Sequence, residues 1–516
     1  MSLPTALEYL QGLSPTMLWG LCLAGLLLTF ILRAFYNVFL HPLARYPGPI
    51  LWTSSVIPYQ IALLRGTAHL HSAQLHERYG PVVRVSPNEL SYITAKAWTD
   101  IYGRRHPEQL KKHPDITSAP AGGTHGLANT PSDDDHARIR RLMVSGFSER
   151  GVRAQEEFFT VHIDRLITKI KETVFSRLGT TGTEDQDTID LTLLFHATTF
   201  DIITDLAFGE SAETLQKGTD WISLTMPLAR GRIMHIVASS YSSLIIPIMR
   251  KLFPGIVPNA AIQYFENTVA SLDRRLAQGT GDNSRPDLLQ PVLPHLNSPK
   301  GLSLGELQST MRSLMIAGSE TSASILTSAH YFTLSNPRIY RRLQVEIRSR
   351  FTTGDEINSV TVNQCKYLVA VLQETMRLWP AIAISLPRVT PPEGCEIDGS
   401  WVPGGTKVGV SQWSAYRSER NFARADQFLP ERWLPEGEEE SFINDNRAAF
   451  QPFSTGPRNC LGMNFARAET RIIFARLLLD FDLELLTGRD EWEAQKVYII
   501  WDRCPLYVRV RQAKRR

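Results

Sequence analysis

The most regular hydrophobic pattern in the chain lies at its N-terminus. Residues 9–32 carry no charge, and Met17 to Leu32 is almost wholly apolar. This length is close to the ~20 residues that span the hydrocarbon core of a bilayer. Glu8 precedes the apolar run and Arg33 follows it, whereas a cleaved signal peptide begins with basic residues and ends at small ones. The pattern predicts one membrane-spanning helix, with a buried N-terminal helix as the alternative.

The charges around this segment predict its orientation. No lysine or arginine precedes Arg33, whereas Arg45 and Arg65 follow it. Basic residues tend to remain on the cytosolic side of a membrane. We therefore expect a single-pass protein whose body faces the cytosol, which in a eukaryotic cell indicates the endoplasmic reticulum membrane.

A proline-rich connection separates this helix from the rest of the chain. The segment Tyr46-Pro47-Gly48-Pro49 is stiff and breaks helices, which weighs against a helix that continues into the body. We expect three parts: residues 1–33 as a lumenal segment and membrane anchor, residues 34–50 as a hinge, and residues 51–516 as the main folded domain.

Beyond the hinge, apolar residues recur mostly at the three- and four-residue spacing that predicts helices. Strands are predicted at three places: a hairpin around Pro87-Asn88, short hairpins within residues 396–410 at Asp398-Gly399 and Gly404-Gly405, and a strand pair that includes Tyr507 to Arg511. The predicted fold class is therefore mainly α with small β-sheets.

One helix and one loop stand out in this pattern. Residues 303–335 form the longest periodic stretch, with Ser303 and Glu306 as a capping box at its start and Asn336-Pro337 at its end. In contrast, His113 to Asp135 is rich in Pro, Gly, Ala, Ser and Thr and has little apolar periodicity. It predicts a long mobile loop, either a substrate-contacting lid or a plain surface loop.

Composition narrows the class of function. The formal net charge is only +3, from 55 Lys+Arg and 52 Asp+Glu, so no overall field favours nucleic acid, and a small or apolar ligand fits better. The five cysteines are scattered without paired spacing. This distribution indicates a reducing compartment rather than a disulfide-stapled secreted domain.

The ten residues FSTGPRNCLG carry the most specific chemistry. Cys460 comes just before a helical pattern, where free backbone N–H groups and the helix dipole lower a thiol pKa and favour an anionic metal ligand. Gly456 permits a tight turn, and Gly462 lets the backbone approach a flat cofactor. Arg458 offers a fork of donors to a carboxylate, and Phe453 can pack beneath a ring.

This FxxGxRxCxG pattern resembles the cysteine-ligand signature of the cytochrome P450 family. The resemblance implies a P450 fold in which Cys460 binds the iron of haem b, and a thiolate ligand favours cleavage of the O–O bond. It covers nearly the whole chain, from the YPGP segment to the last strands, with the motifs in the family's order. Residues 51–516 are therefore expected to be a haem-binding catalytic domain.

A second motif lies within the long helix. Ala317-Gly318-Ser319-Glu320-Thr321 places a glycine, an acid and a hydroxyl in an otherwise regular pattern, and is similar to the family's (A/G)-G-x-(D/E)-T motif. The resemblance implies that the helix opens beside the iron and that Gly318 makes room there. It also implies that Glu320 and Thr321 relay protons to bound oxygen.

Two further segments resemble the family's structural charge network. Glu374 and Arg377 lie three residues apart, so on a helix they share a face. Pro430-Glu431-Arg432-Trp433 is similar to the family's PERF-like segment. The resemblance implies that Arg432 closes a buried network with the other two residues.

Three basic residues are candidates to hold the haem propionates. His136-Ala-Arg-Ile-Arg140 resembles the family's (W/H)xxxR pattern, in which His136 and Arg140 would face the propionates, and Arg388 is a further candidate. Taken singly, each could instead be a solvated surface charge. Arg138 and Arg141 beside them could dock an acidic reductase or simply form an exposed helix face.

The general character of the sequence resembles filamentous-fungal P450s of the isotrichodermin hydroxylase-like type, which tailor polyketides, terpenoids or alkaloids. The resemblance implies a small hydrophobic substrate, molecular oxygen, and NADPH as electron source through NADPH–cytochrome P450 reductase, with cytochrome b5 as a further candidate partner. By the family's layout, residues 113–130, Met311 to Thr321 and Ala381 to Leu386 would contact substrate.

Three alternatives remain open at this stage. The same ligand loop would serve a haem-thiolate enzyme that desaturates, cyclises, rearranges or couples its substrate. A membrane-anchored haem sensor without catalytic activity belongs to a different class, and the acid and alcohol at Glu320-Thr321 argue against it. A structural membrane protein with a fortuitous cysteine is the third.

Overall fold

The computed structural model describes residues 14–104, 107–117, 123–175, 187–218, 220–239, 259–279, 287–435 and 442–513. Its helices of eight or more residues are α2 (Pro15–Phe35), α4 (Ile57–Arg65), α5 (Ala68–Tyr79), α8 (Asp133–Met143), α9 (Glu149–Phe175), α10 (Leu191–Phe208), α13 (Thr225–Ser239), α15 (Asn259–Ala277), α16 (Leu304–Leu334), α17 (Pro337–Arg350), α18 (Lys366–Leu378) and α20 (Met463–Asp480).

Shorter elements connect these helices. The short α-helices are α3 (Ile50–Ser54), α6 (Ala95–Trp98), α7 (Pro114–Thr117), α11 (Thr214–Lys217), α12 (Asp220–Ser223), α19 (Gln412–Tyr416) and α21 (Arg489–Glu493), with π-helical turns η1 (Tyr36–Leu40) and η2 (Thr99–Gly103). The 3₁₀ turns are η4 (Leu293–His295), η5 (Gly354–Glu356), η6 (Val362–Gln364), η7 (Pro430–Trp433) and η9 (Arg447–Ala449).

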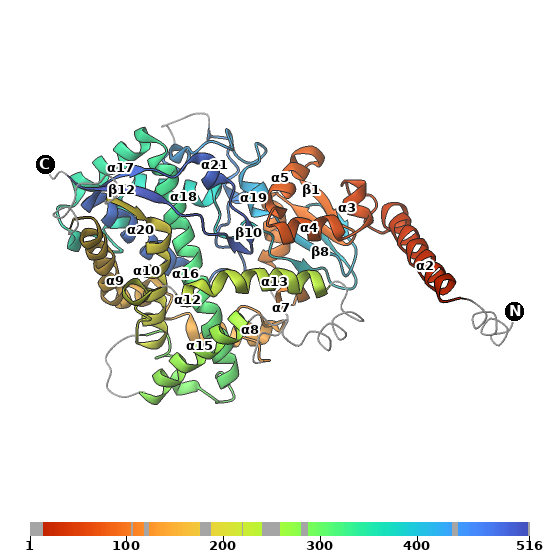
Figure 1. The fold of residues 1–516 in the computed structure, drawn as a ribbon, viewed down its shortest axis with the longest axis horizontal. Coiled ribbons are helices and arrows are strands. Elements are labelled where there is room, and N and C mark those ends of the chain that lie inside the picture. Colours follow the sequence, from red (N-terminus) through yellow and green to blue (C-terminus); the bar gives the residue numbers. More distant parts are fainter. Residues whose placement is uncertain are drawn as a thin grey trace.

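The strands form small sheets, of which the one with β1 and β8 and the one with β12 lie at opposite ends of the body (Figure 1). They are β1 (Val82–Ser86), β2 (Glu89–Tyr92), β3 (Lys111–Lys112), β4 (Thr188–Asp190), β5 (Arg388–Val389), β6 (Cys395–Ile397), β7 (Ser400–Val402), β8 (Lys407–Val410), β9 (Phe481–Leu485), β10 (Val497–Tyr498), β11 (Ile500–Trp501) and β12 (Tyr507–Gln512). The largest sheet has the order β1-β2-β8-β5-β3, and a second has the order β4-β12-β9. The fold is therefore mainly α with small sheets, as predicted.

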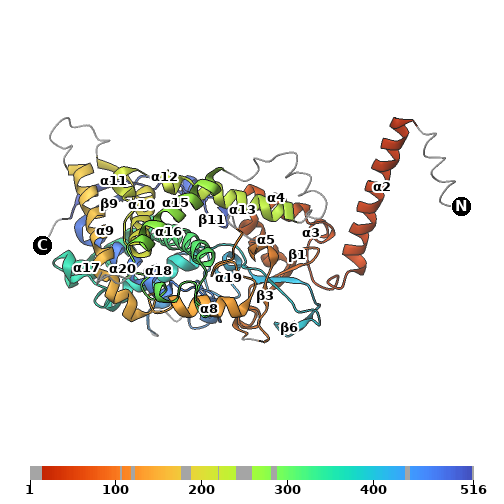
Figure 2. The ribbon, with the colours of Figure 1, turned by 90° about the horizontal axis from the view of Figure 1, so that it is seen from below.

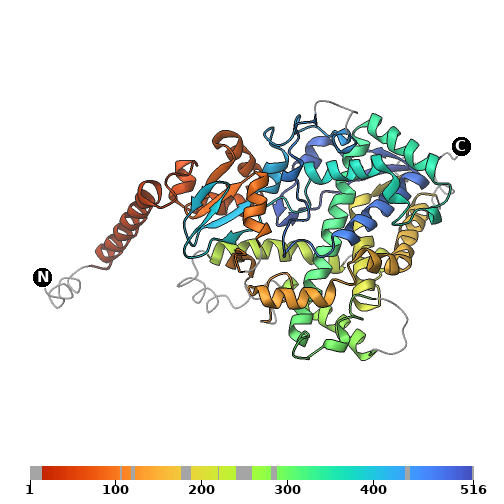
Figure 3. The same ribbon diagram turned by 180° about the vertical axis from the view of Figure 1, so that it is seen from behind.

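The long helix α16 is the axis of the core (Figures 1 and 3). The Ser303 side chain caps its start and Glu306 completes the capping box, so the predicted helix is confirmed at both ends. It packs against α10, which is buried along almost its whole length, and against α15, α18 and α20. A helix that is apolar all round is stable only when neighbouring elements cover every face. The helix α10 is covered in this way, since almost all of its residues are buried.

The N-terminal helix α2 projects away from the body (Figures 1 and 2). None of its described residues is buried. Together with η1 it spans Pro15–Leu40, which is long and apolar enough to cross a membrane. The helix continues past residue 33, where the sequence placed the end of the anchor. The prolines that follow it lie outside any helix, and α3 begins only at Ile50.

The predicted hairpins are confirmed in part. The strands β1 and β2 pair antiparallel around Pro87-Asn88, and β6 and β7 pair around Asp398-Gly399. The second glycine pair, Gly404-Gly405, makes no hairpin, because β8 instead pairs parallel with β2 and antiparallel with β5. The last predicted strand is confirmed as β12, which pairs with β9.

The predicted loop from His113 to Asp135 was too long. It contains α7, and its last three residues form the first turn of α8, where the Ser132 side chain caps the helix. Three successive aspartates at a helix start suit the helix dipole, so the helix begins within the segment that the composition assigned to the loop. Residues 118–122 of the expected loop lie outside the described residues.

Removing residues 1–33 should free the protein from the membrane without unfolding it. The cut lies before Asn37, whose side chain donates to the Ser54 carbonyl at 2.8 Å, and α2 buries nothing against the body. We expect an alkaline wash to release the shortened protein from membranes while the full chain stays in the pellet, with equal melting temperatures in detergent. Retention of the shortened protein after that wash would show that another surface anchors it.

Candidate functional site

A largely apolar cavity of about 470 Å³ lies between α16 and the segment that leads into α20. Leu314, Ala317, Gly318 and Thr321 line it from α16, and Cys460 lines it from the opposite wall. Each of the three segments expected to contact substrate contributes to the wall. These contributions are Leu127 and Ala128 from the first, the α16 residues from the second, and Ala381, Ile382 and Leu386 from the third.

The loop around Cys460 has the tight backbone that its glycines predicted. The Cys460 N–H donates to the Phe453 carbonyl at 2.9 Å, which closes the loop. Gly456 has φ +75°, and a Cβ at that position would overlap the carbonyl oxygen of Tyr102. Only glycine satisfies both constraints. Gly462 is the N-cap of α20, so the cysteine lies at the start of that helix, as expected.

Cys460 is exposed and lines this cavity. Burial raises its pKa, while the Gly462 N–H, Arg140 and Arg467 act to lower it. The expected net lowering of the thiol pKa is therefore wrong for the protein without a metal, because the cost of burying a thiolate exceeds the help from the helix start. A bound metal ion reverses this balance, since coordination deprotonates a thiol.

A cluster of basic side chains lies at one side of the cavity. Lys112, His136, Arg140 and Arg458 line the cavity, and Arg388 lies close enough to act on the pKa of His136. Burial lowers the pKa of His136 to about 3, and the four neighbouring cations add to the effect. Burial and the same kind of repulsion from Arg388 and Arg458 hold the pKa of Lys112 well below its usual value. A site with this excess of positive charge favours an anionic ligand.

The arginines of this cluster are held by the protein itself. Arg458 donates to Asp133 at 2.6 Å and to the carbonyls of Thr130 and Ser132. Arg140 donates to Asn459 through both its carbonyl and its side chain, at 2.8 and 2.6 Å. Asp133 is the one carboxylate that acts on the cluster within the described residues. It leaves most of the positive charge uncompensated.

Lys112 is a member of this cluster that the sequence analysis missed. It lies on β3, directly opposite Arg388 on β5, and its ammonium donates to the Ala128 carbonyl at 2.6 Å. No motif surrounds Lys112 in the sequence. Its only signal is the pairing of two strands that are almost 280 residues apart, which cannot be read from the sequence alone.

On α16, the acid and the alcohol point in different directions. Gly318 and Thr321 line the cavity, whereas Glu320 does not. The helix is continuous through this region, and the Thr321 hydroxyl donates to the Ala317 carbonyl at 2.6 Å. A Cβ on Gly318 would meet Ile203 of α10 at 2.8 Å. The glycine therefore makes room for the neighbouring helix, and the expected opening of α16 is absent.

Glu320 is bound on the far side of α16. Its carboxylate accepts hydrogen bonds from Thr225 at 2.9 Å and from Arg503, and the His196 ring lies 3.4 Å away. Burial acts to raise its pKa, but His196 and Arg503 outweigh burial and hold the pKa at about 2. Glu320 is thus a carboxylate at neutral pH. Arg503 and His196 carried no signal in the sequence.

Glu374, Arg377 and Arg432 form the predicted network. Arg377 donates to Glu374 at 2.8 and 2.9 Å, Arg432 donates to it at 3.1 Å, and all three side chains are fully buried. Burial acts to raise the pKa of Glu374, but the two arginines lower it overall. Sequence reasoning missed Asp445, which binds Arg432 at 2.5 Å, and Trp433, whose indole donates to Glu374 at 2.9 Å.

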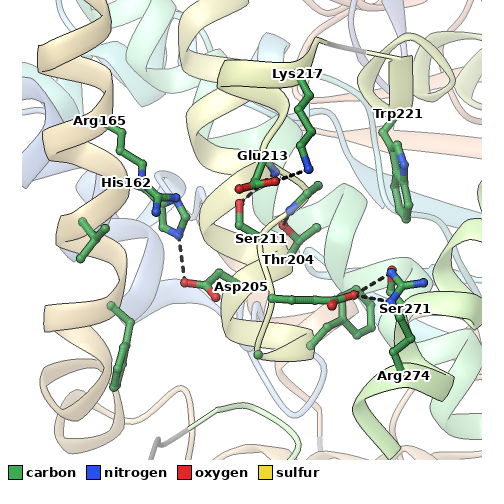
Figure 4. Close-up of a pocket in the computed structure, with 16 residues that line it drawn as sticks. His162, Arg165, Thr204, Asp205, Ser211, Glu213, Lys217, Trp221, Ser271 and Arg274 are labelled. Atoms are coloured by element: carbon green, nitrogen blue, oxygen red, sulfur yellow. Dashed lines mark hydrogen bonds and ion pairs between the residues drawn. The ribbon is translucent and has the colours of Figure 1, made fainter.

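A second hollow, of about 680 Å³, lies elsewhere on the surface between α9, α10 and α15 (Figure 4). Several of its polar side chains pair with one another, among them His162 with Asp205 at 2.9 Å and Lys217 with Glu213. None of the predicted site residues lines it.

Comparison with known proteins shows the family of the chain. The family model for cytochrome P450 matches residues 47–501. The chain belongs to the cytochrome P450 family. It is 39% identical to cytochrome P450 monooxygenase efuB of Hormonema carpetanum, over 94% of each chain. It is also 39% identical to averantin hydroxylase of Dothistroma septosporum, over 95% of this chain and 90% of the relative.

A third relative broadens the range of named activities. The chain is 37% identical to fusicoccadiene 8-ol C-16-hydroxylase of Phomopsis amygdali, over 95% of this chain and 92% of the relative. The expected family is therefore confirmed, and the protein is a P450 monooxygenase of the kind found in fungal secondary metabolism. The cavity of this P450 fits a haem. It offers a thiol on one wall, a buried cluster of unbalanced cations for two propionates, and apolar walls for a flat ring.

Replacing Glu374 by glutamine should destabilise the P450 fold by about 3–5 kcal/mol, because it leaves buried arginine charge uncompensated. The pKa of Glu374 is lowered in the folded state from 4.5. Its contribution is therefore present above pH 4.5 and lost as the pH falls below that value. Urea unfolding at pH 7 and at lower pH measures both effects, with the exposed Glu157→Gln as control. Equal stability of the two variants at pH 7 would contradict the assignment.

Proposed function

We propose that this P450 is a single-pass membrane enzyme that oxidises a small hydrophobic secondary metabolite. In this proposal haem b is the cofactor, O₂ is the oxidant, and NADPH supplies electrons through NADPH–cytochrome P450 reductase. The observation that carries the proposal is the position of Cys460. It faces an apolar cavity at the start of a helix, opposite a helix that carries a threonine toward the same space.

The protein's own residues bind and orient the cofactor in this proposal. Cys460 supplies the iron ligand, with Phe453 and Gly462 against the ring. Arg458, Arg388, His136 and Arg140 hold the propionates, with Lys112 as a further member. When bound, haem supplies the activation of oxygen and the insertion of an oxygen atom into substrate. Binding two carboxylates would also relieve the repulsion within the cation cluster.

Proton supply to the cavity is the second task of the protein. Thr321 lies in the wall. Its hydroxyl donates to the Ala317 carbonyl, so it accepts a hydrogen bond from the cavity as it stands and must turn away from that carbonyl to donate one. We propose Glu320 as the partner of Thr321 in relaying protons, although its carboxylate is bound to Arg503 and Thr225. For Glu320 to carry a proton, it must leave these partners and turn around the helix.

The proposed domain arrangement follows the same observations. Residues 1–33 form the lumenal segment and most of the anchor, residues 34–50 the hinge, and residues 51–516 the catalytic domain in the cytosol, at the endoplasmic reticulum membrane. Arg138 is engaged by Glu306 and Asp135, so of the two arginines considered for reductase docking only Arg141 is exposed. Cytochrome b5 remains a further candidate partner.

The substrate class follows from the cavity and the relatives. The cavity wall is mainly apolar, and relatives are named as hydroxylases of averantin and of fusicoccadiene 8-ol. We propose a compact hydrophobic polyketide, terpenoid or alkaloid. Desaturation, cyclisation, rearrangement or coupling on the same haem is the alternative outcome, and a haem sensor is a remote one.

The metal ligand can be tested by substitution. The Cys460→Ser variant should lose the Soret band that is typical of a thiolate-ligated, reduced haem–carbon monoxide complex, because a serine hydroxyl does not replace the thiolate. Cys504→Ser, which changes a cysteine outside the cavity, should keep that band. Retention of the band in Cys460→Ser would refute the ligand assignment.

The type of reaction can be tested on metabolites. A strain that lacks this protein should accumulate the substrate, and adding the purified P450 with reductase, NADPH and oxygen should convert that compound. A gain of one oxygen atom in mass spectrometry is expected for the hydroxylase. A product with unchanged mass indicates rearrangement, and no NADPH-dependent turnover of any accumulated compound supports the sensor.

A further inference from the structure

The second hollow, between α9, α10 and α15, is lined by groups for which the proposed haem site has no use (Figure 4). Its volume of about 680 Å³ lies within the range of sites that bind small organic molecules, roughly 300–1,000 Å³. The short helices α11 and α12 complete its walls with Lys217 and Trp221. The hollow is therefore large enough for a ligand of its own.

The buried part of the hollow carries a polar pair. His162 and Asp205 are only 3% and 8% exposed, and both line the hollow. The Nε2 atom of His162 lies 2.9 Å from the Asp205 carboxylate. The other ring nitrogen, Nδ1, makes no hydrogen bond to the protein within the described residues, so it is free to bind a polar group of a ligand.

The charges of the hollow leave one cation over. Glu210 binds Arg274 at 2.6 Å, and Glu213 binds Lys217. The pKa of Glu213 is lowered mainly by Lys217, with Arg165 acting on it from further away. Within the described residues the exposed guanidinium of Arg165 makes no hydrogen bond or ion pair. The positive charge of Arg165 is thus available to an anion.

A second free cation lies one turn further along α9. A neighbouring hollow of about 460 Å³ shares Val161 and Arg165 with the first and is also lined by Lys169. The Lys169 ammonium makes no hydrogen bond or ion pair within the part of the chain that the structure describes. Of the acids here, Asp164 binds Arg476 at 2.6 Å, and Glu172 is engaged as well. Like charges four residues apart on a helix repel, and an anion bound between them would relieve that repulsion.

Aromatic rings line the same hollow. Phe208 of α10 is buried, Trp221 of α12 is half-buried, and Phe158 of α9 contributes a third ring. Val161, which is 45% exposed, joins this apolar wall to the two free cations. Aromatic and aliphatic side chains favour a flat apolar ligand. Together with the cations they favour an aromatic ring that carries an acidic group.

The helix α10 separates this hollow from the proposed haem cavity. Ile203 lines that cavity, whereas the next two residues, Thr204 and Asp205, line the second hollow. The same helix is bound to α16, because the Thr199 hydroxyl donates to the Ser319 carbonyl at 3.0 Å. One rigid element therefore contributes to the walls of both spaces.

The outer wall of the hollow is also tied to α10. The Asp201 carboxylate of α10 accepts the N–H groups of Thr214 and Leu215 at 2.7 and 3.0 Å, at the start of α11. The last residue of α11 is Lys217, which lines the hollow. A ligand that draws α11 and α9 together would thus act on α10, and packed elements of this kind can carry coupling between two sites.

We propose that the second hollow is an effector site for a small aromatic acid. The acidic group binds Arg165 and Lys169, the ring packs against the aromatic wall, and His162 binds a polar substituent of the ring. Occupancy changes the affinity of the haem cavity for its ligands through α10. This inference goes beyond the proposed monooxygenase function, because it concerns regulation at a site that takes no part in the reaction.

Binding can be measured by equilibrium dialysis of 2-naphthoate against the full-length, haem-loaded protein, with the haem cavity blocked by saturating 4-phenylimidazole. We expect one naphthoate per protein. Arg165→Gln should weaken binding roughly tenfold, because a hydrogen-bonded charge pair is lost. Val161→Trp should abolish binding by filling the hollow. The uncharged 2-naphthamide should bind more weakly than naphthoate to the wild type.

The matched control is Arg153→Gln, which changes another exposed arginine of α9 that lines neither hollow. It should bind naphthoate like the wild type. Absence of binding to the wild type, or equal binding to the wild type, Arg165→Gln and Val161→Trp, would overturn the proposed site.

Coupling can be measured by titrating 4-phenylimidazole and following the Soret shift, with and without saturating 2-naphthoate. We expect naphthoate to change the Kd for 4-phenylimidazole about fivefold in the wild type and in Arg153→Gln, within the usual range of allosteric coupling. The change should be absent from Arg165→Gln and Val161→Trp. An equal change in all four proteins would show competition inside the haem cavity, and no change in a wild type that binds naphthoate would refute the effector role.

Failure of this inference is distinct from failure of the proposed function. Wild-type protein with a thiolate-type Soret band and no naphthoate site leaves the monooxygenase proposal intact and removes only the effector site. Loss of the thiolate assignment in the Cys460→Ser test leaves the dialysis result for the second hollow unchanged.

Discussion

The buried pairing of one glutamate with two arginines organises the side of the molecule that carries the cysteine. Arg377 binds Glu374 and also donates to the carbonyls of Tyr416 and Ala425. The Tyr416 hydroxyl in turn accepts the N–H of Gln451, at the entrance of the Cys460 loop. A single carboxylate on α18 therefore fixes the path of a long irregular segment. This matters because irregular backbone has no repeating hydrogen bonds of its own to hold a ligand in place.

Three buried glutamates lie around the site, and the charged groups beside each one give the same type of side chain a different role. Glu374 is neutralised by two arginines and is structural. Glu320 is neutralised by Arg503 and His196, which hold it as a carboxylate away from the cavity. Glu469, on α20, has no cation among the groups that act on it, and burial raises its pKa to about 8. The residue type is the same in each case, and the neighbouring charge decides whether it can accept or donate a proton.

Much of the site could be predicted because its residues lie in short, locally ordered segments. The Cys460 loop, the capping box of α16 and the Glu374–Arg377 pair depend on neighbours within about ten residues, so spacing alone indicated their geometry. Lys112, Arg503 and His196 could not be found this way, since each reaches the site through contacts between distant segments. The side of α16 on which the Glu320 side chain lies could not be predicted from the sequence either. Adjacent residues on a helix point about 100° apart, and the sequence does not show which of them faces the cavity.

The cation cluster links cofactor binding to the stability of the sheet beside it. Lys112 and Arg388 are direct partners across β3 and β5, and like charges placed opposite each other destabilise a strand pair. Desolvation adds to that cost, as the lowered pKa of Lys112 indicates. Two propionates between these side chains would turn the repulsion into attraction. The edge of the five-stranded sheet thus carries positive charge that a negatively charged occupant would compensate, so binding of the proposed cofactor would also stabilise this edge.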